Sequence, residues 1–387
     1  MKAIINGHIK TMAGKEYKKG TILIEGTKIK AVGNASEIKV PKNAEVIDAE
    51  GRLVMPGFID AHSHLGMFDE LIGFRGSDGN EITDPITPHL RAIDSIYPMD
   101  EPFVDTYKGG VTSVVTGPGS ANVIGGQFAA IKTCGISVDE MLIKAPVAMK
   151  CAFGENPKVC YNELHRMPTT RMAVAALLRE SLQLTRDYML RKEAAKGDVT
   201  KEPGFNAKWE ALIPVVKGKL PIKVHAHRAD DILTAIRIAK EFKLKMTLDH
   251  CTEGHLIVDQ IKKSGFNAII GPSYGDKPKP ELKNKTFETA AILSKAGVKV
   301  AIMTDNPVLP QGDLPMFAAM AVKAGMDREE ALKAISINAA EITGIADRVG
   351  SIKAGKDADI VIWNNDPFSL EAETGLVMIS GEVVHSK

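Results

Sequence analysis

Short apolar runs that end at turn residues dominate both ends of the chain. In residues 1–54 and again in residues 348–387, aliphatic and β-branched side chains occur a few at a time, and turn residues follow them. The runs are Ala3–Ile5, Thr21–Ile24, Ile29–Val32, Asp359–Trp363 and Gly375–Val384. Runs of this length with such punctuation are typical of β-strands. The pattern predicts one small β-sandwich domain formed from both termini.

Apolar strands alternate with helical stretches through residues 55–347. The predicted strands include Val111–Val115, Ile222–His225, Lys245–His250, Ala268–Ile270 and Val298–Ile302. The predicted helices include Asp230–Phe242, Glu253–Ser264, Thr286–Ala296 and Asp327–Thr343. Repeated β–α units of this kind predict an α/β fold, a TIM-like (β/α)8 barrel. Functional residues are then expected at the C-terminal ends of the strands.

Residues 165–220 interrupt this alternation. They contain two predicted helices, Arg171–Lys196 and Asn206–Val216, and charged runs such as Arg191–Glu193. We interpret the segment as a solvated helical insertion beside the barrel, from which it could cover an active site.

Composition narrows the functional class. The 387 residues are 44% hydrophobic and 25% charged, with a net charge of +1, so nothing indicates binding to nucleic acid or to an anionic membrane. There is no apolar run long enough to span a bilayer and no signal-peptide pattern at the N-terminus. The four cysteines form no Cys-x-x-Cys pair. We expect a cytoplasmic protein with reduced thiols, a small-molecule substrate and, as an open point, a homo-oligomeric state.

Two histidines spaced one residue apart are the most informative feature. His62 and His64 close the apolar stretch Met55–Gly66. Side chains at i and i+2 of a strand leave the same face, so both imidazoles can bind one metal ion at a strand end. A single His-x-His is weak evidence, and its weight comes from the matching residues that follow.

Lys150 lies inside an apolar run that leads to Glu155. Burial lowers the pKa of a lysine, and a neutral amine can add CO₂ to give a carbamate that bridges two cations. The alternatives are a lysine that reaches solvent or pairs with Glu155. Glu155 is also the rival bridging ligand.

Three further strand ends carry candidate ligands. His225 and His250 each follow an apolar strand, and neutral imidazole is the usual ligand of zinc-like ions. Asp305 follows a late strand and could bind metal and accept a proton from a metal-activated water. Taken alone, each residue has a structural alternative: a packed histidine, or a turn aspartate in Asp-Asn-Pro.

Other polar residues have alternative roles. His227 shares the face of His225 and either polarises a substrate carbonyl or orients a ligand. His165 and Arg171 could hold a substrate carboxylate, although a solvated helix start is an equal alternative. Gly117–Gly126 lacks the residues of a phosphate-binding loop and is expected to line the pocket.

The order His62-x-His64, Lys150, His225, His250, Asp305, flanked by a split sandwich, resembles the amidohydrolase superfamily. The chain is most similar to the imidazolonepropionase-related branch, which also contains dipeptidase-like and prolidase-like enzymes. The resemblance covers essentially the whole chain. Its most specific motifs are Met-Pro-Gly-Phe-Ile-Asp-Ala-His-Ser-His, which ends at His64, and the closing Gly350–Val361.

The resemblance implies a two-metal site and a hydrolytic activity. His62, His64 and Asp305 would hold one divalent cation, with zinc expected from the ligand types, and His225 and His250 a second, with CO₂-derived carbamate on Lys150 as the bridge. A metal-activated hydroxide would hydrolyse a C–N amide or peptide-like bond, with Asp305 as the proton carrier. Manganese or iron would also suit these ligands.

One position departs from the related deaminases. They typically carry a glutamate three residues after the histidine of the fifth strand, where this chain has Arg228. The departure disfavours deamination. The alternatives that stay open are a mononuclear cyclic-amide hydrolase of the imidazolonepropionase type, a deaminase, and a non-catalytic relative.

Overall fold

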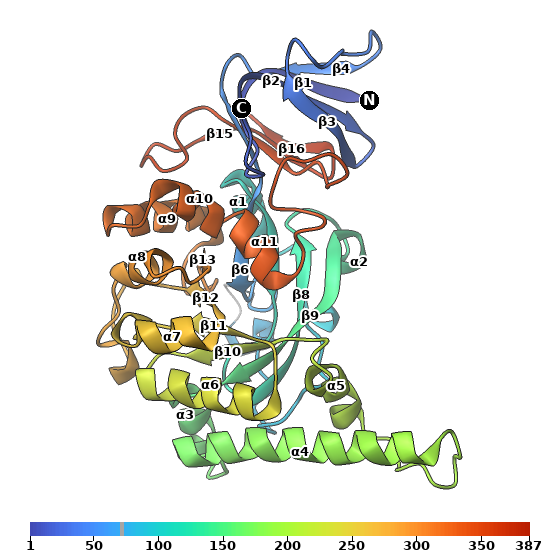
Figure 1. The fold of residues 1–387 in the computed structure, drawn as a ribbon, viewed down its shortest axis with the longest axis vertical. Helices are drawn as coiled ribbons and strands as arrows, with labels where there is room; N and C mark the ends of the chain where they lie inside the picture. Colours follow the sequence, from blue (N-terminus) through green and yellow to red (C-terminus); the bar gives the residue numbers. More distant parts are fainter. Residues whose placement is uncertain (70–72) are drawn as a thin grey trace.

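A sheet built from both termini forms the smaller part of the fold (Figure 1). The computed structural model describes residues 1–69 and 73–387. In this sheet the strand order is β16-β15-β14-β5-β1-β2-β3, and β4 pairs with β1. The strands are β1 (Lys2–Lys10), β2 (Glu16–Glu25), β3 (Lys28–Asn34), β4 (Glu45–Asp48), β5 (Leu53–Pro56), β14 (Ile360–Trp363), β15 (Thr374–Ile379) and β16 (Glu382–Ser386). Strand β5 joins the two halves, because it pairs with both β1 and β14.

The second sheet forms the barrel. Its strands follow one another in chain order: β6 (Phe58–Ser63), β7 (Val111–Thr116), β8 (Ile124–Lys132), β9 (Leu142–Ala152), β10 (Ile222–Ala226), β11 (Met246–His250), β12 (Asn267–Ile270) and β13 (Val300–Ile302). The first and last strands approach each other at their C-terminal ends, where the backbone N–H of His64 donates to Asn306 O over 2.9 Å. The sheet is therefore nearly closed, and the predicted TIM-like barrel with a second sheet from the termini is confirmed.

One strand runs against the others. Strand β8 is antiparallel to both β7 and β9, so this barrel does not have eight parallel strands. Residues 117–123 link β7 to β8, and a parallel neighbour would need a crossover of about a dozen residues or more. The expected glycine-rich loop Gly117–Gly126 therefore ends inside β8 as part of a hairpin.

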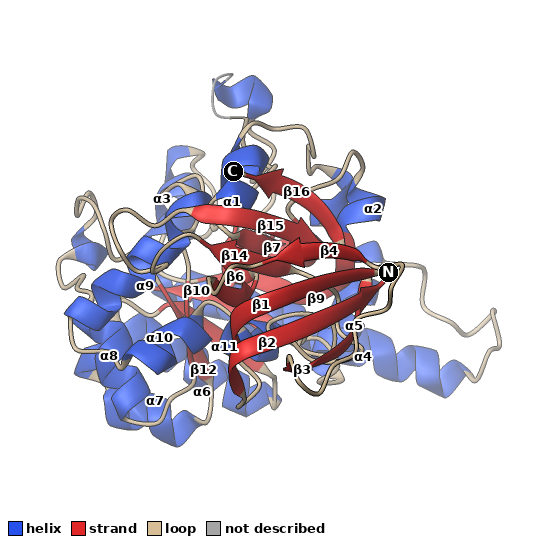
Figure 2. Cartoon of the chain, turned by 90° about the horizontal axis from the view of Figure 1, so that it is seen from above, coloured by secondary structure: helices blue, strands red, loops and turns tan. Residues whose placement is uncertain are grey.

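Helices surround the strands, which cross the centre of the molecule in Figure 2. The α-helices are α1 (Pro102–Lys108), α2 (Val138–Met141), α3 (Glu155–Glu163), α4 (Arg171–Ala195), α5 (Ala207–Val216), α6 (Ala229–Phe242), α7 (Val258–Ser264), α8 (Glu288–Lys295), α9 (Leu314–Lys323), α10 (Arg328–Ala334) and α11 (Ile337–Thr343). The 3-10 turns are η1 (Gly73–Gly76), η2 (Ala92–Asp94), η3 (Gly254–Leu256), η4 (Pro280–Leu282) and η5 (Gln311–Asp313). Among the described helices, none combines the length and apolar character that a membrane span requires.

Two predicted helices are broken in the structure. The stretch 327–343 divides into α10 and α11, because Ser336 leaves the helical region at φ −140°, ψ −100° and its hydroxyl donates to Leu332 O. The stretch 253–264 divides into η3 and α7 at Ile257. Helical periodicity alone did not reveal these breaks.

The insertion contains the two predicted helices, α4 and α5. Helix α4 lies across the end of the molecule away from the terminal sheet (Figure 1). It is fixed to α6 by an ion pair between Arg179 and Glu241 and by the Arg186 guanidinium, which donates to Phe242 O and stacks on the Phe242 ring. Helix α4 thus packs against α6 and supports it.

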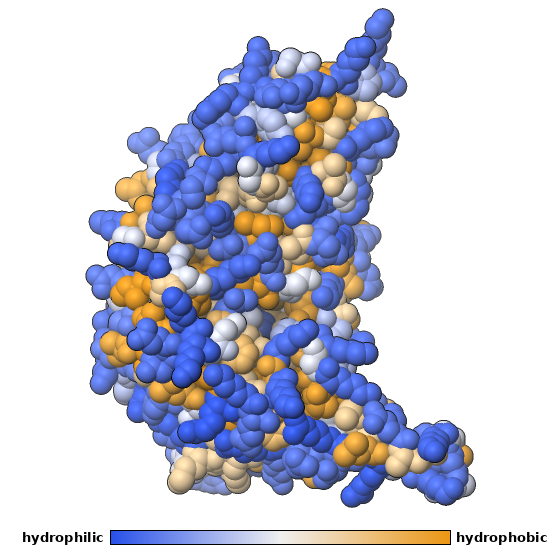
Figure 3. Space-filling view, in the orientation of Figure 1, coloured by the Kyte–Doolittle hydropathy of each residue, from blue (hydrophilic) through white to orange (hydrophobic). Residues whose placement is uncertain are grey.

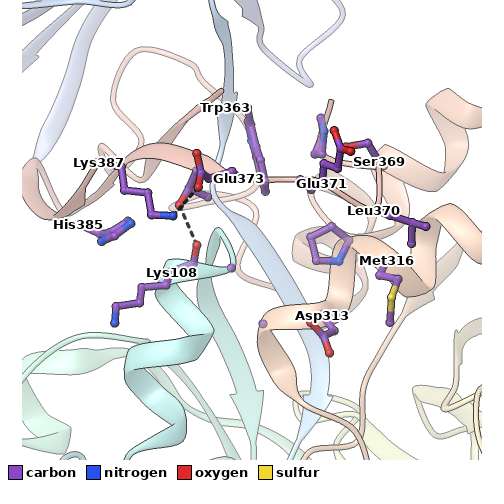
Figure 4. A pocket seen from close by; sticks show the side chains of 16 residues that line it. Lys108, Asp313, Met316, Trp363, Ser369, Leu370, Glu371, Glu373, His385 and Lys387 are labelled. Atoms are coloured by element: carbon purple, nitrogen blue, oxygen red, sulfur yellow. Dashed lines mark hydrogen bonds and ion pairs between the residues drawn. The ribbon is translucent and has the colours of Figure 1, made fainter. Parts of the chain in front are cut away.

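Polar and apolar contacts join the two parts of the fold. The Lys132 ammonium of β8 pairs with Asp357 (2.9 Å) and Asp359, which precede β14. Trp363 of β14 packs on Phe58 at the start of β6, with ring centroids 5.4 Å apart. Trp363 also borders a junction cavity of about 510 Å³, near which Lys387 pairs with Glu373 (Figure 4). This cavity lies at the end of β6 opposite to His62. Figure 3 shows a mostly hydrophilic surface with scattered apolar patches, as expected of a folded protein.

Candidate metal centre

The C-terminal ends of the barrel strands bring seven side chains together. His62 ends the β6 stretch and His64 follows it, Lys150 lies on β9, His225 on β10 with His227 just beyond, His250 ends β11, and Asp305 follows β13. Their ligand atoms form two groups, each with all atoms within 4.8 Å of one another: His62, His64 and Asp305, and His225, His227 and His250. Residues separated by more than 200 positions in the sequence therefore converge because parallel strands end at the same barrel face.

Hydrogen bonds fix the tautomers of the first histidine pair. His62 Nδ1 lies 2.5 Å from Asp249 Oδ2, and His64 Nδ1 lies 2.6 Å from Gly117 O. Each Nδ1 is thus a donor, and each Nε2 carries its lone pair toward the centre. These two Nε2 atoms face Asp305 Oδ1 at 3.5 and 3.3 Å. A ligand histidine held through its second nitrogen is the usual arrangement at metal sites.

The second group contains buried nitrogens without partners. His250 Nδ1 donates to Gly271 O over 2.8 Å, and its buried Nε2 has no hydrogen-bond partner among the described residues. His225 Nδ1 is also buried and unpartnered there. Such orphaned acceptors are costly unless something satisfies them, and a cation between the rings would do so. The residues present therefore fit a metal.

His227 belongs to the second group by position. Its ring lies 4.7 Å from that of His225 and 4.6 Å from that of His250, and its Nδ1 is 2.8 Å from Thr252 Oγ1. The sequence had suggested a role on the substrate or as an orienting residue. The geometry adds the role of third ligand to these alternatives.

Burial keeps the imidazoles neutral. It lowers the pKa of His62, His225 and His227 well below the usual value, and neighbouring charges lower these pKa values further. Burial likewise lowers the pKa of His250 to about 4. Burial raises the pKa of Asp305, but the adjacent histidines outweigh this effect and hold it below its ordinary value. The centre thus presents neutral nitrogens and an ionised carboxylate, the protonation states that bind cations.

Lys150 is fully buried on β9, the strand that pairs with the His225-bearing β10. Its Nζ lies 3.1 Å from His62 Nε2 and 5.5 Å from the Phe128 ring centroid. Burial lowers the pKa of Lys150 to about 8. The two alternative roles do not match this position, because the side chain does not reach solvent and no ion pair joins it to Glu155 in the described structure. Glu155 begins α3 and is absent from both groups of candidate ligands in residues 1–69 and 73–387.

Two buried aspartates that the sequence analysis did not name hold the candidate ligands in position. Buried Asp249 accepts from His62 and pairs with Lys223 Nζ at 2.8 Å. Buried Asp60 accepts from the backbone N–H of His62 and from the Thr304 hydroxyl, which ties β6 to the segment bearing Asp305. Their positions in the sequence could have identified them, because Asp249 precedes His250 and Asp60 lies two residues before His62.

The structure does not bring the two proposed substrate residues to the centre. His165 is exposed beyond α3. Arg171 begins α4, and its Nε donates to both carboxylate oxygens of Asp231, at 3.1 and 3.0 Å. Neither lines the cavity over the histidines as far as the described residues show. The arginine charge is instead used to balance a buried aspartate.

A cavity of about 470 Å³ opens over the two groups. Besides the candidate ligands, its wall contains polar residues from connecting loops and from the start of α3: Asn80, Ser120, Asn156, Tyr274, Asp276, Lys279 and Lys285. Ser120 lies in the stretch Gly117–Gly126, which was expected to line the pocket. The sequence analysis assigned no site role to the other six, because loop residues carry no periodic pattern. No residue of the helical insertion 165–220 appears among the described wall residues, so the structure does not support its suggested role as a cover.

Comparison with known proteins supplies the family. Residues 215–384 and 45–86 each match a family model described as "Amidohydrolase family". The chain is similar to the solved amidohydrolase of Thermotoga maritima MSB8, with 40% identity, complete coverage of both chains and a TM-score of 0.96. It is 30% identical over 94% of its length to the amidohydrolase tasK of Hapsidospora irregularis, of which it spans only 39%.

Imidazolonepropionase relatives are more distant. The enzyme of Bacillus cytotoxicus is 24% identical, with coverage of 89% of this chain and 82% of the relative. The two family-model matches and the solved relative with 40% identity over its full length all indicate the same family. The chain belongs to the amidohydrolase family, whose members are hydrolases that act on carbon–nitrogen bonds.

Proposed function

We propose that this chain is a metal-dependent hydrolase of a C–N amide or peptide-like bond in a small molecule, with two cations at the centre. The observation that carries the proposal is the pair of ligand groups, with buried Lys150 in contact with His62 of the first group and on the strand that pairs with the His225 strand. A single-metal site would need one such group. Two groups, each with three ligand atoms within 4.8 Å, favour the binuclear alternative.

The residues divide between the cations by position. His62, His64 and Asp305 would hold one cation, and His225 and His250, with or without His227, would hold the second. When bound, the cations would lower the pKa of a water molecule and polarise the substrate carbonyl. Zinc suits the imidazole ligands, and manganese or iron is compatible with them.

Lys150 would contribute the bridge. Its Nζ attacks CO₂ and loses a proton, which gives an N-carboxylate with two oxygen ligands. The reaction requires the neutral amine, and a pKa of about 8 leaves a far larger neutral fraction near pH 7.5 than an ordinary lysine has. Glu155 is the alternative bridge and would require movement of the start of α3.

Asp305 would move the proton. Its Oδ1 faces the Nε2 atoms of His62 and His64, and it accepts no hydrogen bond among the described residues. An ionised carboxylate here can take a proton from the attacking water and return it to the leaving nitrogen. His227, in the second histidine group, is the candidate to orient the substrate carbonyl if it is not itself a ligand.

Deamination is less well supported. The position of the expected glutamate holds Arg228, whose guanidinium pairs with Asp230 over 3.0 and 2.9 Å at the start of α6. This side chain does not appear among the described residues that line the cavity. It therefore supplies no proton carrier for deamination.

Metal content tests the proposal. The full chain would be purified without chelator in the presence of bicarbonate, and bound metal would be measured per chain. The same preparation would be assayed for release of amine from dipeptides, N-acyl amino acids and cyclic amides. About two equivalents of metal with hydrolysis of a C–N bond is the expected result. About one equivalent would favour the mononuclear alternative, and absence of both metal and turnover would favour a non-catalytic relative.

A further inference from the structure

A lysine-bearing loop forms one wall of the cavity over the metal centre. It follows β12 and contains Lys279 and Lys285, which both line the cavity. Both side chains are partly buried. Two cationic side chains on the wall of a substrate cavity raise the question of what they bind.

The two lysines have different partners. Lys285 Nζ donates to two backbone carbonyls of its own loop, Tyr274 O at 2.8 Å and Asp276 O at 2.6 Å, so it shapes the loop. Lys279 Nζ donates to a neutral amide oxygen, Asn156 Oδ1, at 2.5 Å. No ion pair joins Lys279 to a carboxylate in the described part of the chain. Of the two lysines, Lys279 is therefore the one whose positive charge is still able to bind an anion.

Its position next to the metal centre is fixed from both sides. Asn156 Nδ2 donates to Ser120 Oγ over 2.6 Å and lies 3.3 Å from His225 Nε2, so the amide links Lys279 to the second histidine group. On the other side, buried Glu281 accepts the backbone N–H of Glu155 at 3.0 Å and anchors the loop to the start of α3. The ammonium is thus held in place before any ligand arrives, which reduces the entropy lost on binding.

We propose that Lys279 and Asn156 form an anion subsite, and that the substrates of this centre carry a carboxylate within reach of the bond that is cleaved. A carboxylate needs one cation and a neutral donor, which the Lys279 ammonium and the Ser120 hydroxyl supply, and Asn156 holds both of these groups in place. A phosphate would require further cations, and the Lys285 ammonium already donates to two backbone carbonyls. The proposal rests on the proposed function, because the cleaved bond is the one assigned to the metal centre.

Matched ligand pairs test the subsite. A panel of N-acetyl-L-amino acids and their primary amides differs only in the carboxylate. Binding of each pair would be measured by calorimetry on the full chain depleted of metal, where a carboxylate cannot coordinate a cation. Hydrolysis of the same pairs would be measured on the metal-loaded protein as kcat/KM. The variants are Lys279→Met, Lys279→Arg as the conservative replacement, and Lys283→Met as a control on an exposed lysine of the same loop.

The expected result is a preference for the acid over the amide of at least about tenfold in the wild type, since a hydrogen bond to a charged group typically gives this much. The preference should fall to about onefold in Lys279→Met, persist in large part in Lys279→Arg, and be unchanged in Lys283→Met. Equal acid preference in wild type and Lys279→Met would overturn the proposal, as would the absence of any acid preference across the panel.

The two proposals fail in different ways. Hydrolysis of amides and acids with equal efficiency would remove the anion subsite and leave the proposed function. Lysine-dependent binding of acids by a chain that hydrolyses neither this panel nor the dipeptides and cyclic amides, with or without metal, would keep the subsite and remove the proposed function.

Discussion

Lys150 Nζ and His62 Nε2 lie 3.1 Å apart, and neither side chain is exposed to solvent. A protonated lysine would not remain at that distance from a nitrogen that must bind a cation. The lysine therefore has to become a ligand, a bridge, or a competitor of the metal. Its contact with the first ligand group, on the strand that pairs with the His225 strand, favours the bridge.

Replacing Lys150 tests that role. We expect Lys150→Met to reduce bound metal from about two equivalents to about one and to lower kcat by at least about 100-fold, since even residues behind a ligand cost 10–100-fold. Metal analysis and steady-state kinetics measure both. Lys144→Met is the control, because Lys144 lies on the same strand and is exposed. A loss of the second metal in Glu155→Gln instead would assign the bridge to Glu155.

Asp305 allows a separation of binding from catalysis. We expect Asp305→Asn to keep most of the bound metal and to lower kcat by about 10²–10⁴-fold, the range of general acid–base catalysis. The amide keeps an oxygen ligand but cannot accept the proton. Asp276→Asn is the control for a carboxylate that borders the cavity but belongs to neither candidate ligand group. Near-normal turnover by Asp305→Asn would remove the aspartate from the mechanism.

The sequence predicted the site residues best where a potential ligand directly follows or ends a predicted strand. His62, His64, His225, His250 and Asp305 were identified because an apolar run stops at a polar residue, and parallel strands stop at one face. Lys150 was identified because a lysine is rarely placed in an apolar strand.

Residues outside such runs were not predicted. Asn156, Lys279 and Glu281 come from loops or the start of a helix, and only the fold brings them to the centre. The direction of β8 was also missed, because an apolar run has the same composition in either direction. Its antiparallel pairing depends on the short connection after Thr116, whose length the pattern analysis did not weigh.

Asp249 couples the metal centre to the stability of the barrel. It is fully buried, accepts from His62 Nδ1 and lies 2.8 Å from Lys223 Nζ. We expect Asp249→Asn to weaken metal binding by about 10–100-fold, because His62 loses the acceptor that fixes its tautomer. It should also lower the free energy of unfolding by about 3 kcal/mol, because Lys223 remains buried without a counter-charge.

A double variant separates the two effects of Asp249. Asp249→Asn with Lys223→Met removes both charges, so the free energy of unfolding in urea should recover in large part. Metal affinity, measured by titration with a metal indicator, should not recover. Recovery of both quantities together would show that Asp249 acts on the metal only through the stability of the fold.

The pH dependence of stability should report on Asp357, which joins the barrel to the terminal sheet. Its carboxylate is buried and accepts from Lys28 at 2.5 Å and Arg348 at 2.8 Å, with Lys132 at 2.9 Å. Burial raises the pKa of Asp357, but these cations outweigh burial and lower it below the ordinary value of 3.8. The unfolded chain then binds this proton more readily than the folded chain, so the stabilisation is present above about pH 4 and is lost as the pH falls through the folded-state pKa.

Replacing Asp357 measures this stabilisation directly. We expect Asp357→Asn to lower the free energy of unfolding by about 3 kcal/mol at pH 7, as for the loss of one partner in a buried ion pair, and by progressively less below pH 4. Urea unfolding of wild type and variant from pH 3 to pH 7 gives the difference at each pH. Asp366→Asn, which breaks an exposed pair with Arg328, should change it by less than about 1 kcal/mol throughout. A difference for Asp357→Asn that is independent of pH would mean that the carboxylate acts by packing and hydrogen bonding rather than by its charge.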